Sequence, residues 1–324
     1  MASSRKCLST DAPSAAVTGC LNRHVRAGER LTVGLSGGID SVVLLHALRG
    51  LDHPLSALHV HHGLSPNADR WEHFCLDLCR DWDIPLAIER VEVERGSPEG
   101  LEAAARRARH AAFERTPGDW ILLAHHRGDQ AETLLFNLLR GTGVRGASAM
   151  GERNGRLLRP FLSIGRAGIV VHAEAHGLPW IEDESNDDVR FSRNWLRHRI
   201  LPELARRFPG TEAGLAGAAR RFAEAQALLD ELAEMDLGEA PRDFPVALDR
   251  LKALSEPRAR NLLRYLLARR GIGVPSEDRL TEALRQCVKA APDRHPSVAF
   301  GGWHLVRRRS GVTIEPASAV GLTH

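Results

Sequence analysis

A short segment rich in glycine and serine, Ser36-Gly37-Gly38-Ile39-Asp40-Ser41, has the residue types that bind phosphate. It follows an apolar run and opens a helical pattern, so we expect it to join a strand to a helix N-terminus. The two glycines allow a sharp turn that exposes backbone N–H groups, and the helix N-terminus favours an anion. The serine hydroxyls add donors, and the Asp40 carboxylate suits magnesium. A bare S-G-G would favour an ordinary strand-to-helix turn, but the full S-G-G-x-D-S pattern is far more specific and predicts a nucleotide-phosphate site.

The loop lacks the lysine that reaches the terminal phosphates in the G-x-x-x-x-G-K-[ST] loop of ATP hydrolases. No lysine lies between Lys6 and Lys252. The loop itself would therefore hold a pyrophosphate. In this it resembles the PP-loop pyrophosphatases, which include GMP, NAD and argininosuccinate synthetases and several tRNA-modifying enzymes. The resemblance implies that ATP is cleaved between its α and β phosphates, with release of AMP.

Two further polar clusters lie at the C-terminal ends of expected strands. One contains His59, His61 and His62, and the other contains His125, His126, Asp129 and Glu132. Ligands gather at the carboxyl ends of strands in an open parallel sheet, so we expect both clusters to face the phosphate loop. Asp129 and Glu132 lie three apart in a first helical turn and share a face that suits magnesium or an amine. A dinuclear metal hydrolase with His and Asp ligands is the alternative, but it leaves the glycine loop without a role.

The elements that position these residues alternate between strand and helix up to about residue 205. Expected strands cover 31–36, 55–60, 84–93 and 120–125, and expected helices cover 41–48, 71–82, 99–115 and 131–140. This alternation predicts an α/β fold with a doubly wound parallel sheet. The segment Gly141–Gly146 matches G-x-G-x-x-G, but it follows a helix. We interpret it as a helix stop and a mobile loop, with no dinucleotide site.

The pattern changes near residue 208. Long helices are expected at 211–236, 256–270 and 276–289, and short strands between 297 and 316. We expect a nucleotide-binding catalytic domain at 1–208 and a smaller, mostly helical C-terminal domain with short terminal strands at 209–324. The resemblance to tRNA-modifying PP-loop enzymes implies that this second domain binds the substrate or the tRNA. Thr211 is a candidate cap for the first of these helices.

Composition narrows the class of protein. The 324 residues include 44 basic and 41 acidic side chains, and all the basic ones except three lysines are arginines. Arginine excess fits either codon bias or contact with RNA. Five cysteines fit free thiols in a reducing cytoplasm. No apolar run reaches the length of a membrane span, and the N-terminus is a poor signal peptide.

Several longer segments occur in a fixed order with the phosphate loop. They are HVHHGLSPNAD, EAAARRARHAAF, LAHHRGDQAETLLFNLLRGTGVRG, RPFL, IEDESND and FSRNWLRHRILPEL. Together they closely resemble the tRNA(Ile)-lysidine synthetase family over about residues 30–205, and more weakly through to the LVRRR segment. The resemblance implies a ligase that uses ATP to adenylate the wobble cytidine of tRNA(Ile) with a CAU anticodon. Free L-lysine then displaces AMP to give lysidine, and ATP and Mg²⁺ are the implied cofactors.

The resemblance also assigns site residues. The nucleotide would contact Ser36, Gly37, Gly38, Asp40, Ser41 and His62. Catalysis would involve Asp40, Asp129, Glu132 and Arg106, with Asp40 and Asp129 as magnesium ligands. The tRNA would contact Arg109, Arg193, Asn194 and Arg197. Arg193 and Arg197 lie four apart and form one basic helical face for phosphates, although such runs are often only solvated helices.

Two other functions remain in view. A PP-loop tRNA thiolase commonly uses paired cysteines or a C-x-x-C cluster site, whereas Cys75 and Cys79 lie four apart on an expected amphipathic helix. A non-catalytic RNA- or nucleotide-binding module would not need the acidic residues Asp40, Asp129 and Glu132. Many family members carry a further C-terminal domain, so the sequence leaves undetermined how this chain binds the body of the tRNA. It also leaves undetermined whether the protein forms a homodimer.

Overall fold

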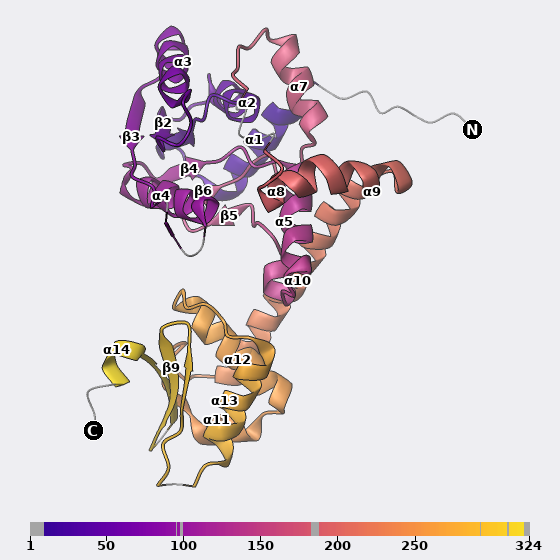
Figure 1. The fold of residues 1–324 in the computed structure, drawn as a ribbon. Coiled ribbons are helices and arrows are strands. Elements are labelled where there is room, and N and C mark those ends of the chain that lie inside the picture. The colour runs from indigo at the N-terminus through magenta and orange to yellow at the C-terminus, as the bar shows by residue number, and fades with distance from the viewer. Residues whose placement is uncertain are drawn as a thin grey trace. The chain divides into compact units, whose positions relative to one another are not determined.

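The structure is a computed structural model, and it describes residues 10–94, 96–97, 100–182, 188–291, 293–309 and 311–320. The chain forms two compact units, Met1–Ala223 and Glu224–His324 (Figure 1). The units divide within helix α10 (Thr211–Leu237), whereas the boundary expected at residue 208 falls just before this helix. The exact domain boundary therefore stays a prediction.

Unit 1 is built on a six-stranded sheet with the order β3-β2-β1-β4-β6-β5. Five strands run parallel, namely β1 (Leu31–Gly34), β2 (Leu55–His61), β3 (Leu86–Arg90), β4 (Trp120–Leu122) and β6 (Leu157–Leu158). The edge strand β5 (Arg153–Asn154) is antiparallel to β6. The predicted α/β class with a parallel-dominated sheet is confirmed.

Neighbouring residues along these strands pack on opposite faces of the sheet, as the strand repeat requires. Leu122 and Leu158 join the larger core, which includes α1 (Ala12–His24), α2 (Ile39–Leu48), α3 (Ala68–Asp81) and α7 (Arg166–Ala175). Ile121 and Leu157 instead pack with Phe113 of α4 (Leu101–Arg115). Helices therefore cover both faces, which makes the sheet doubly wound.

The strand order reverses direction at β1. The chain moves from β1 outward through β2 and β3, then returns to β4 on the other side of β1. At such a switch point the connections leave on opposite faces and open a crevice at the carboxyl ends of the two central strands. The phosphate loop follows β1, and helix α5 (Arg127–Leu139) follows β4. Both candidate clusters are thus positioned at this crevice.

Several sequence expectations need correction. Helices α1 and α7 were not expected, and the third strand covers Leu86–Arg90 only, because pairing with β2 ends there. Gly141 does end α5, with φ of +72°, but the following segment forms the short helix α6 (Val144–Ala147) where a mobile loop was expected. Thr211 is the first residue of α10 itself, so the N-cap position falls on the residue before it, and Thr211 Oγ1 donates to the Phe208 carbonyl oxygen.

Unit 2 combines helices with an antiparallel sheet of order β7-β10-β9-β8. The strands are β7 (Val246–Ala247), β8 (Ser297–Phe300), β9 (Trp303–Arg308) and β10 (Gly311–Pro316). The helices are the end of α10, α11 (Leu248–Ala253), α12 (Glu256–Arg269), α13 (Glu277–Lys289) and α14 (Ala317–Val320). The smaller, helix-rich second domain with short terminal strands is confirmed. Within the described part of the chain, no helix has the length and apolar character needed to cross a bilayer.

Candidate active site

The loop between β1 and α2 is held in shape by its own serines. Ser41 Oγ donates to the Gly38 carbonyl oxygen (2.9 Å) and accepts from the Ser36 N–H (3.2 Å), while the Gly38 N–H donates to Ser36 Oγ (3.3 Å). The hydroxyl proton of Ser41 is used inside the loop, so its expected donation to a phosphate would require the O–H to turn away from the Gly38 carbonyl oxygen. The N–H groups of the first helical turn have no partners within a helix and point outward, which suits an anion.

Gly37 is required by its conformation and by its neighbour. Its φ is +86°, and a Cβ at this position would lie 2.7 Å from Cδ1 of Ile181. The Ile181 N–H also donates to the Gly37 carbonyl oxygen at 3.0 Å. The segment after α7 therefore packs against the loop, and no side chain fits between them.

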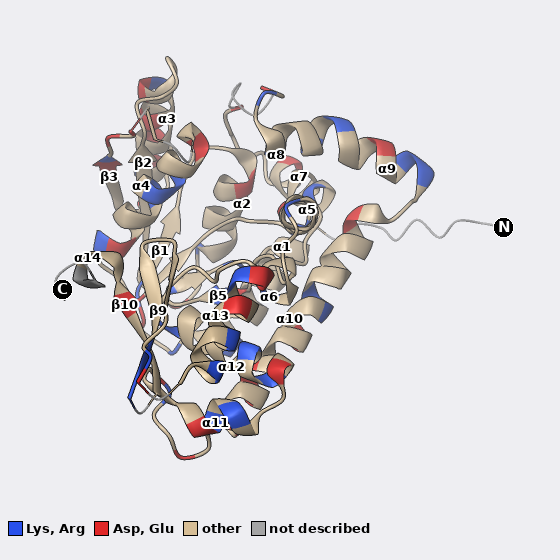
Figure 2. Ribbon diagram, turned by 60° about the horizontal axis from the view of Figure 1, so that its bottom comes forward, with Lys and Arg blue, Asp and Glu red and all other residues tan. Residues whose placement is uncertain are grey.

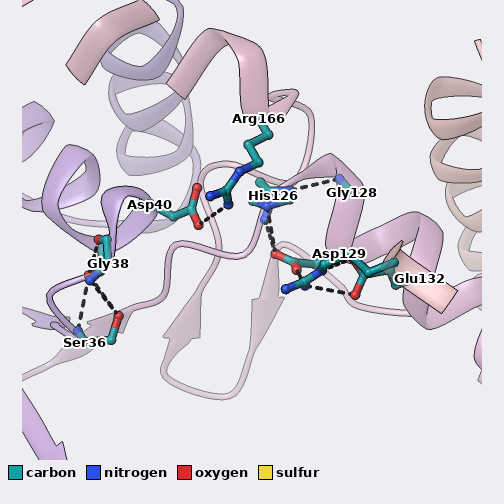
Figure 3. A network of polar contacts seen from close by, with 10 residues as sticks. Ser36, Gly38, Asp40, His126, Gly128, Asp129, Glu132 and Arg166 are labelled. Atoms are coloured by element: carbon teal, nitrogen blue, oxygen red, sulfur yellow. Dashed lines mark hydrogen bonds and ion pairs between the residues drawn. The ribbon is translucent and has the colours of Figure 1, made fainter. Parts of the chain in front are cut away.

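Asp40 lies in the first turn of α2, where its Oδ2 accepts from Arg166 Nη1 at 3.2 Å (Figure 3). Its Oδ1 is buried and has no hydrogen-bond partner among the described residues. Burial raises the pKa of the Asp40 carboxyl, while nearby His126 and Arg166 act in the opposite direction. A buried carboxylate oxygen without a partner is a suitable ligand for a hard cation, so Mg²⁺ fits at Asp40.

The helix after β4 begins with a reciprocal cap. His126 Nδ1 accepts from the Gly128 N–H (3.0 Å), and Asp129 Oδ2 accepts from the His126 N–H (2.8 Å). This arrangement satisfies N–H groups at the start of α5 and fixes the Asp129 side chain. Figure 3 shows His126 between Asp40 and Asp129, so the two carboxylates flank one imidazole.

Arg197 binds both carboxylates of α5. Its Nε donates to Glu132 Oε1 (2.6 Å), and its Nη2 donates to Glu132 Oε2 (2.9 Å) and to Asp129 Oδ1 (3.0 Å). Arg197 belongs to η2 (Leu196–Ile200), a π-helical turn between α8 (Ser192–Trp195) and α9 (Leu201–Arg207). The guanidinium is therefore a member of the carboxylate cluster and does not stand free on an outer basic face.

The two carboxyl groups are held in different ionisation environments. Burial raises the pKa of Glu132, and the hydrogen bonds from Arg197 only partly offset this effect. Burial also acts on Asp129, but His126, His125 and the His126 N–H together hold its pKa below the ordinary value. Asp129 is thus the more firmly ionised group, and Glu132 is the better proton acceptor near neutral pH.

A cluster of arginines lies at the same edge of the sheet. Burial and mutual repulsion lower the pKa values of Arg106 and Arg109, and Arg193 contributes to both shifts. Burial and Arg106 lower the pKa of Arg159, which directly follows β6, to about 10. Arginines that lower one another's pKa values have too few acidic groups nearby to balance their charge. The cluster therefore favours binding of a polyanion.

Unpartnered polar atoms mark the same region. His62 Nδ1, His125 Nδ1 and Arg159 Nε are buried without a hydrogen-bond partner within the described ranges. Burial, with Arg109 and other nearby groups, lowers the pKa of His62 to about 4. Burial lowers the pKa of His125 to about 3, although Asp129 opposes the shift. Neutral imidazoles and unsatisfied donors together indicate a site that a polar ligand completes.

The structure brings together most of the residues expected from the sequence. The phosphate loop, Asp129, Glu132, His62, Arg106 and Arg109 lie at the switch-point crevice or in the arginine cluster beside it. The other two histidines of the first cluster are structural. His59 Nδ1 bonds the Leu35 carbonyl oxygen at 2.9 Å, and His61 Nε2 pairs with Asp69 of α3 at 3.1 Å.

The remaining tRNA-contact candidates lie in α8. Arg193 Nε is 3.4 Å from Glu102 Oε1, and its guanidinium sits 5.5 Å from the Phe136 ring centroid. Asn194 Nδ2 donates to the Asp188 carbonyl oxygen at 3.1 Å. Figure 2 shows acidic and basic segments following one another along α9, so that helix has no uniformly basic face. Most of the segment IEDESND before α8, namely residues 183–187, lies outside the described residues.

Two site residues, and the role of a third, were missed by sequence reasoning. Arg166 caps the crevice from α7, an unexpected helix, and Arg159 follows a strand only two residues long. His126 was noted within its cluster but not as the helix cap. The spacing H-x-x-D at a strand end was the available signal for that cap. Arg159 opens the RPFL segment, which could have indicated it, whereas no local pattern indicates Arg166.

Comparison with known proteins agrees with this geometry. A family described as PP-loop domain matches residues 14–204, and one described as TilS substrate binding domain matches residues 247–312. The tRNA(Ile)-lysidine synthase of Nitrosomonas europaea is 44% identical over 91% of this chain. The chain belongs to the tRNA(Ile)-lysidine synthase family. The resemblance drawn from its motifs is confirmed.

A second lysidine synthase and a solved structure also match this chain. The tRNA(Ile)-lysidine synthase of Azoarcus sp. (strain BH72) is 50% identical over 81% of this chain. The matches span 67% and 60% of the Nitrosomonas and Azoarcus proteins, so this chain corresponds to about two thirds of their length. A U34-tRNA thiolase from Methanococcus maripaludis, NcsA, shares the fold with a TM-score of 0.54 at 18% identity, over 68% of this chain and 81% of its own. The family match favours the lysidine synthase interpretation over the thiolase one.

Proposed function

We propose that this chain converts the wobble cytidine of tRNA(Ile) with a CAU anticodon into lysidine, using ATP and free L-lysine. The observation that carries the proposal is the meeting of Asp40, Asp129 and Glu132 beside a phosphate loop and an arginine cluster. A non-catalytic binding module does not require such a set of buried carboxylates. In the first step the cytidine ring carbonyl oxygen would attack the α-phosphate of ATP and release pyrophosphate. In the second, the lysine amine would form a C–N bond as the C–O bond to AMP breaks.

The phosphate loop and the arginines would serve the adenylation step. The N–H groups at the start of α2 are positioned for a pyrophosphate, and Arg106 and Arg109 supply charge for the remaining oxygens. Mg²⁺, when bound, would neutralise phosphate charge, with Asp40 as its best-suited ligand and Asp129 as a second candidate. Arg166 lies against Asp40 and would keep that carboxylate oriented.

Asp129 and Glu132 would serve the lysine step. An ammonium group must first be held and then lose a proton before its nitrogen attacks. The lowered pKa of Asp129 suits the first role, and the raised pKa of Glu132 suits the second. Arg197, expected at first to contact tRNA, instead sets the positions of both carboxylates. We therefore revise its proposed role to positioning.

A hollow near α8 is a candidate tRNA contact. It has a volume of about 350 Å³ and is lined by Phe136, Leu139, Arg140, Val189, Arg190, Ser192, Trp195 and Leu196. Trp195 and Leu139 are exposed for 45% and 68% of their surface. Aromatic rings beside arginines accept unstacked bases and their phosphates, so we place anticodon nucleotides here, with Arg193 and Asn194 nearby.

The thiolase alternative is disfavoured by the cysteines. Cys75 and Cys79 are almost fully buried, and burial raises their thiol pKa values to about 12 and about 11. Thiols in such sites are poor nucleophiles and sulfur carriers. Buried free thiols also fit the proposed cytoplasmic location. A homodimer stays a prediction.

The test is incubation of the protein with ATP, labelled lysine and total tRNA, followed by mass analysis of the wobble nucleoside. A lysine-sized mass gain on cytidine supports the proposal, and a sulfur-for-oxygen change would establish the thiolase instead. ATP–pyrophosphate exchange separates both from a binding module, which would show none.

A further inference from the structure

Three histidines converge at the end of α2 that lies away from the phosphate loop. They are His46 in the last turn of α2, His172 in α7 and His176 directly after α7, and α7 packs beside α2 (Figure 1). One ring nitrogen of each lies within 4.8 Å of those of the other two. Their ring centroids are 4.3–5.2 Å apart. None of the residues assigned to the active site belongs to this histidine cluster.

Backbone hydrogen bonds orient two of the rings. His172 Nδ1 bonds the Thr10 carbonyl oxygen at 2.7 Å, and His176 Nδ1 bonds the His172 carbonyl oxygen at 2.9 Å. Because only a protonated nitrogen donates to a carbonyl, Nδ1 carries a proton in both rings. Each Nε2 atom is then the one that can offer a lone pair, and that of His172 lies in hydrogen-bonding distance of His46 Nδ1. Metal-binding histidines are usually fixed by this kind of bond from the second nitrogen.

The third ring completes the set. His46 Nδ1 lies 3.0 Å from His172 Nε2, and ligands on a tetrahedral Zn²⁺ with bonds of 2.0–2.1 Å are about 3.3 Å apart. Burial, with His172 and His176, lowers the pKa of His46 to about 4, so this ring is neutral near pH 7. A metal here requires only that the His46 proton move to Nε2. Arg49 faces the cluster, but its guanidinium lies over the Trp82 ring at 4.7 Å, which engages that charge.

Access and ligand count point to the type of metal. His172 is buried whereas His176 is exposed, so an ion can enter from solvent. Three imidazoles suit zinc, nickel or copper and are poor ligands for magnesium or calcium. Three protein ligands also leave a fourth position for water.

We propose that His46, His172 and His176 form a binding site for a divalent transition metal, with Zn²⁺ as the best match. The site is separate from the proposed lysidine chemistry and does not depend on it. It would join α2 to α7 at one end, while the Arg166–Asp40 pair joins the same helices at the other. A bound ion would therefore stabilise the helix pair that carries the phosphate loop and Asp40.

Zn²⁺ binding is the direct test. Tag-free, chelator-treated protein is titrated with Zn²⁺ by calorimetry in excess Mg²⁺, which occupies oxygen sites. We expect one equivalent per chain in the wild type. His172→Gln and His176→Ala should each weaken Zn²⁺ binding at least about tenfold. Even mutation of a residue that only hydrogen-bonds to a metal ligand typically lowers metal affinity by about 10–100-fold. Four-coordinate Co²⁺ bands should appear in the wild type and be lost in both variants.

His73→Ala is the matched control. His73 is exposed and bonds the Asp69 carbonyl oxygen four residues earlier at 2.6 Å, as His176 bonds that of His172, but it lies outside the cluster. This variant should bind Zn²⁺ as the wild type does. If the wild type binds no equivalent, or if His176→Ala binds as tightly as His73→Ala, the proposed site does not exist. Because His176 is exposed, its variant decides the question even if His172→Gln fails to fold.

Discussion

Replacing Arg197 with methionine tests whether this side chain positions the carboxylate pair or serves an outer surface. The change removes the charge and keeps most of the side-chain volume. The wild-type guanidinium makes three hydrogen bonds of 2.6–3.0 Å, to Glu132 and Asp129, whose side chains are 5% and 18% exposed. Methionine donates no hydrogen bond, so two buried carboxylates of like charge are left facing each other.

The expected loss of stability follows from this burial. Removing one partner of a fully buried ion pair costs about 3–5 kcal/mol. Arg197 itself is 35% exposed, so water replaces part of the lost solvation. We therefore expect the free energy of unfolding to fall by about 2–3 kcal/mol at about pH 8.

The loss should depend on pH in a defined direction. The pKa of Glu132 is already raised in the folded protein, and loss of Arg197 raises it further. Between the unfolded and folded pKa values the folded state holds a proton that the unfolded chain releases, so stability falls as pH rises through that window. The variant should therefore be closest to the wild type in mildly acidic buffer, where Glu132 takes up a proton, and furthest from it at about pH 8.

Urea unfolding followed by tryptophan fluorescence measures this, since every tryptophan except Trp303 lies in unit 1. Arg206→Met is the control, because Arg206 pairs with Glu203 in the adjacent helix while both side chains are exposed, at 76% and 66%. It should cost less than about 1 kcal/mol at either pH. A loss for Arg197→Met as small as the control's, or one that does not change with pH, would refute the positioning role.

Four further predictions concern the individual steps. Asp40→Asn should abolish adenylation while the fold survives, because a neutral amide holds magnesium poorly; AMP release equal to the wild type would remove Asp40 from the catalytic set. Gly37→Ala should abolish ATP–pyrophosphate exchange, whereas Gly50→Ala, also at positive φ but with no atom within 4 Å of a new Cβ, should lose only about 1–2 kcal/mol of stability. Glu132→Gln should impair lysine transfer more than adenylation, so that activated tRNA accumulates or hydrolyses; equal losses in both steps contradict its role as proton acceptor. Arg193→Ala should reduce the slope of log binding constant against log salt concentration for tRNA by about 0.7–0.9. An unchanged slope would mean that Arg193 contacts only other parts of the protein.

Much of the fold could be predicted from the sequence because it depends on local sequence patterns. The alternation of apolar runs with helical patterns predicted the parallel sheet, and S-G-G-x-D-S predicted the phosphate loop, since a glycine turn and a helix start are set by neighbouring residues. Helix α7 and strand β6 were missed because their pairing and burial come from distant contacts. Leu157 and Leu158 pair with β4, which lies far from them in the sequence, as well as with the two-residue edge strand β5.

The sequence by itself determined which residues are available for chemistry, including Asp40, Asp129 and Glu132, and the family to which the chain belongs. Only the tertiary structure decided how they are used. Arg197 lies 65 residues from Glu132 in the chain, yet its guanidinium binds that carboxylate and not an outer phosphate. Likewise His46 meets His172 across 126 residues. The physical reason is that ion pairing and metal coordination act over a few ångströms in space, and the folded backbone alone sets those distances.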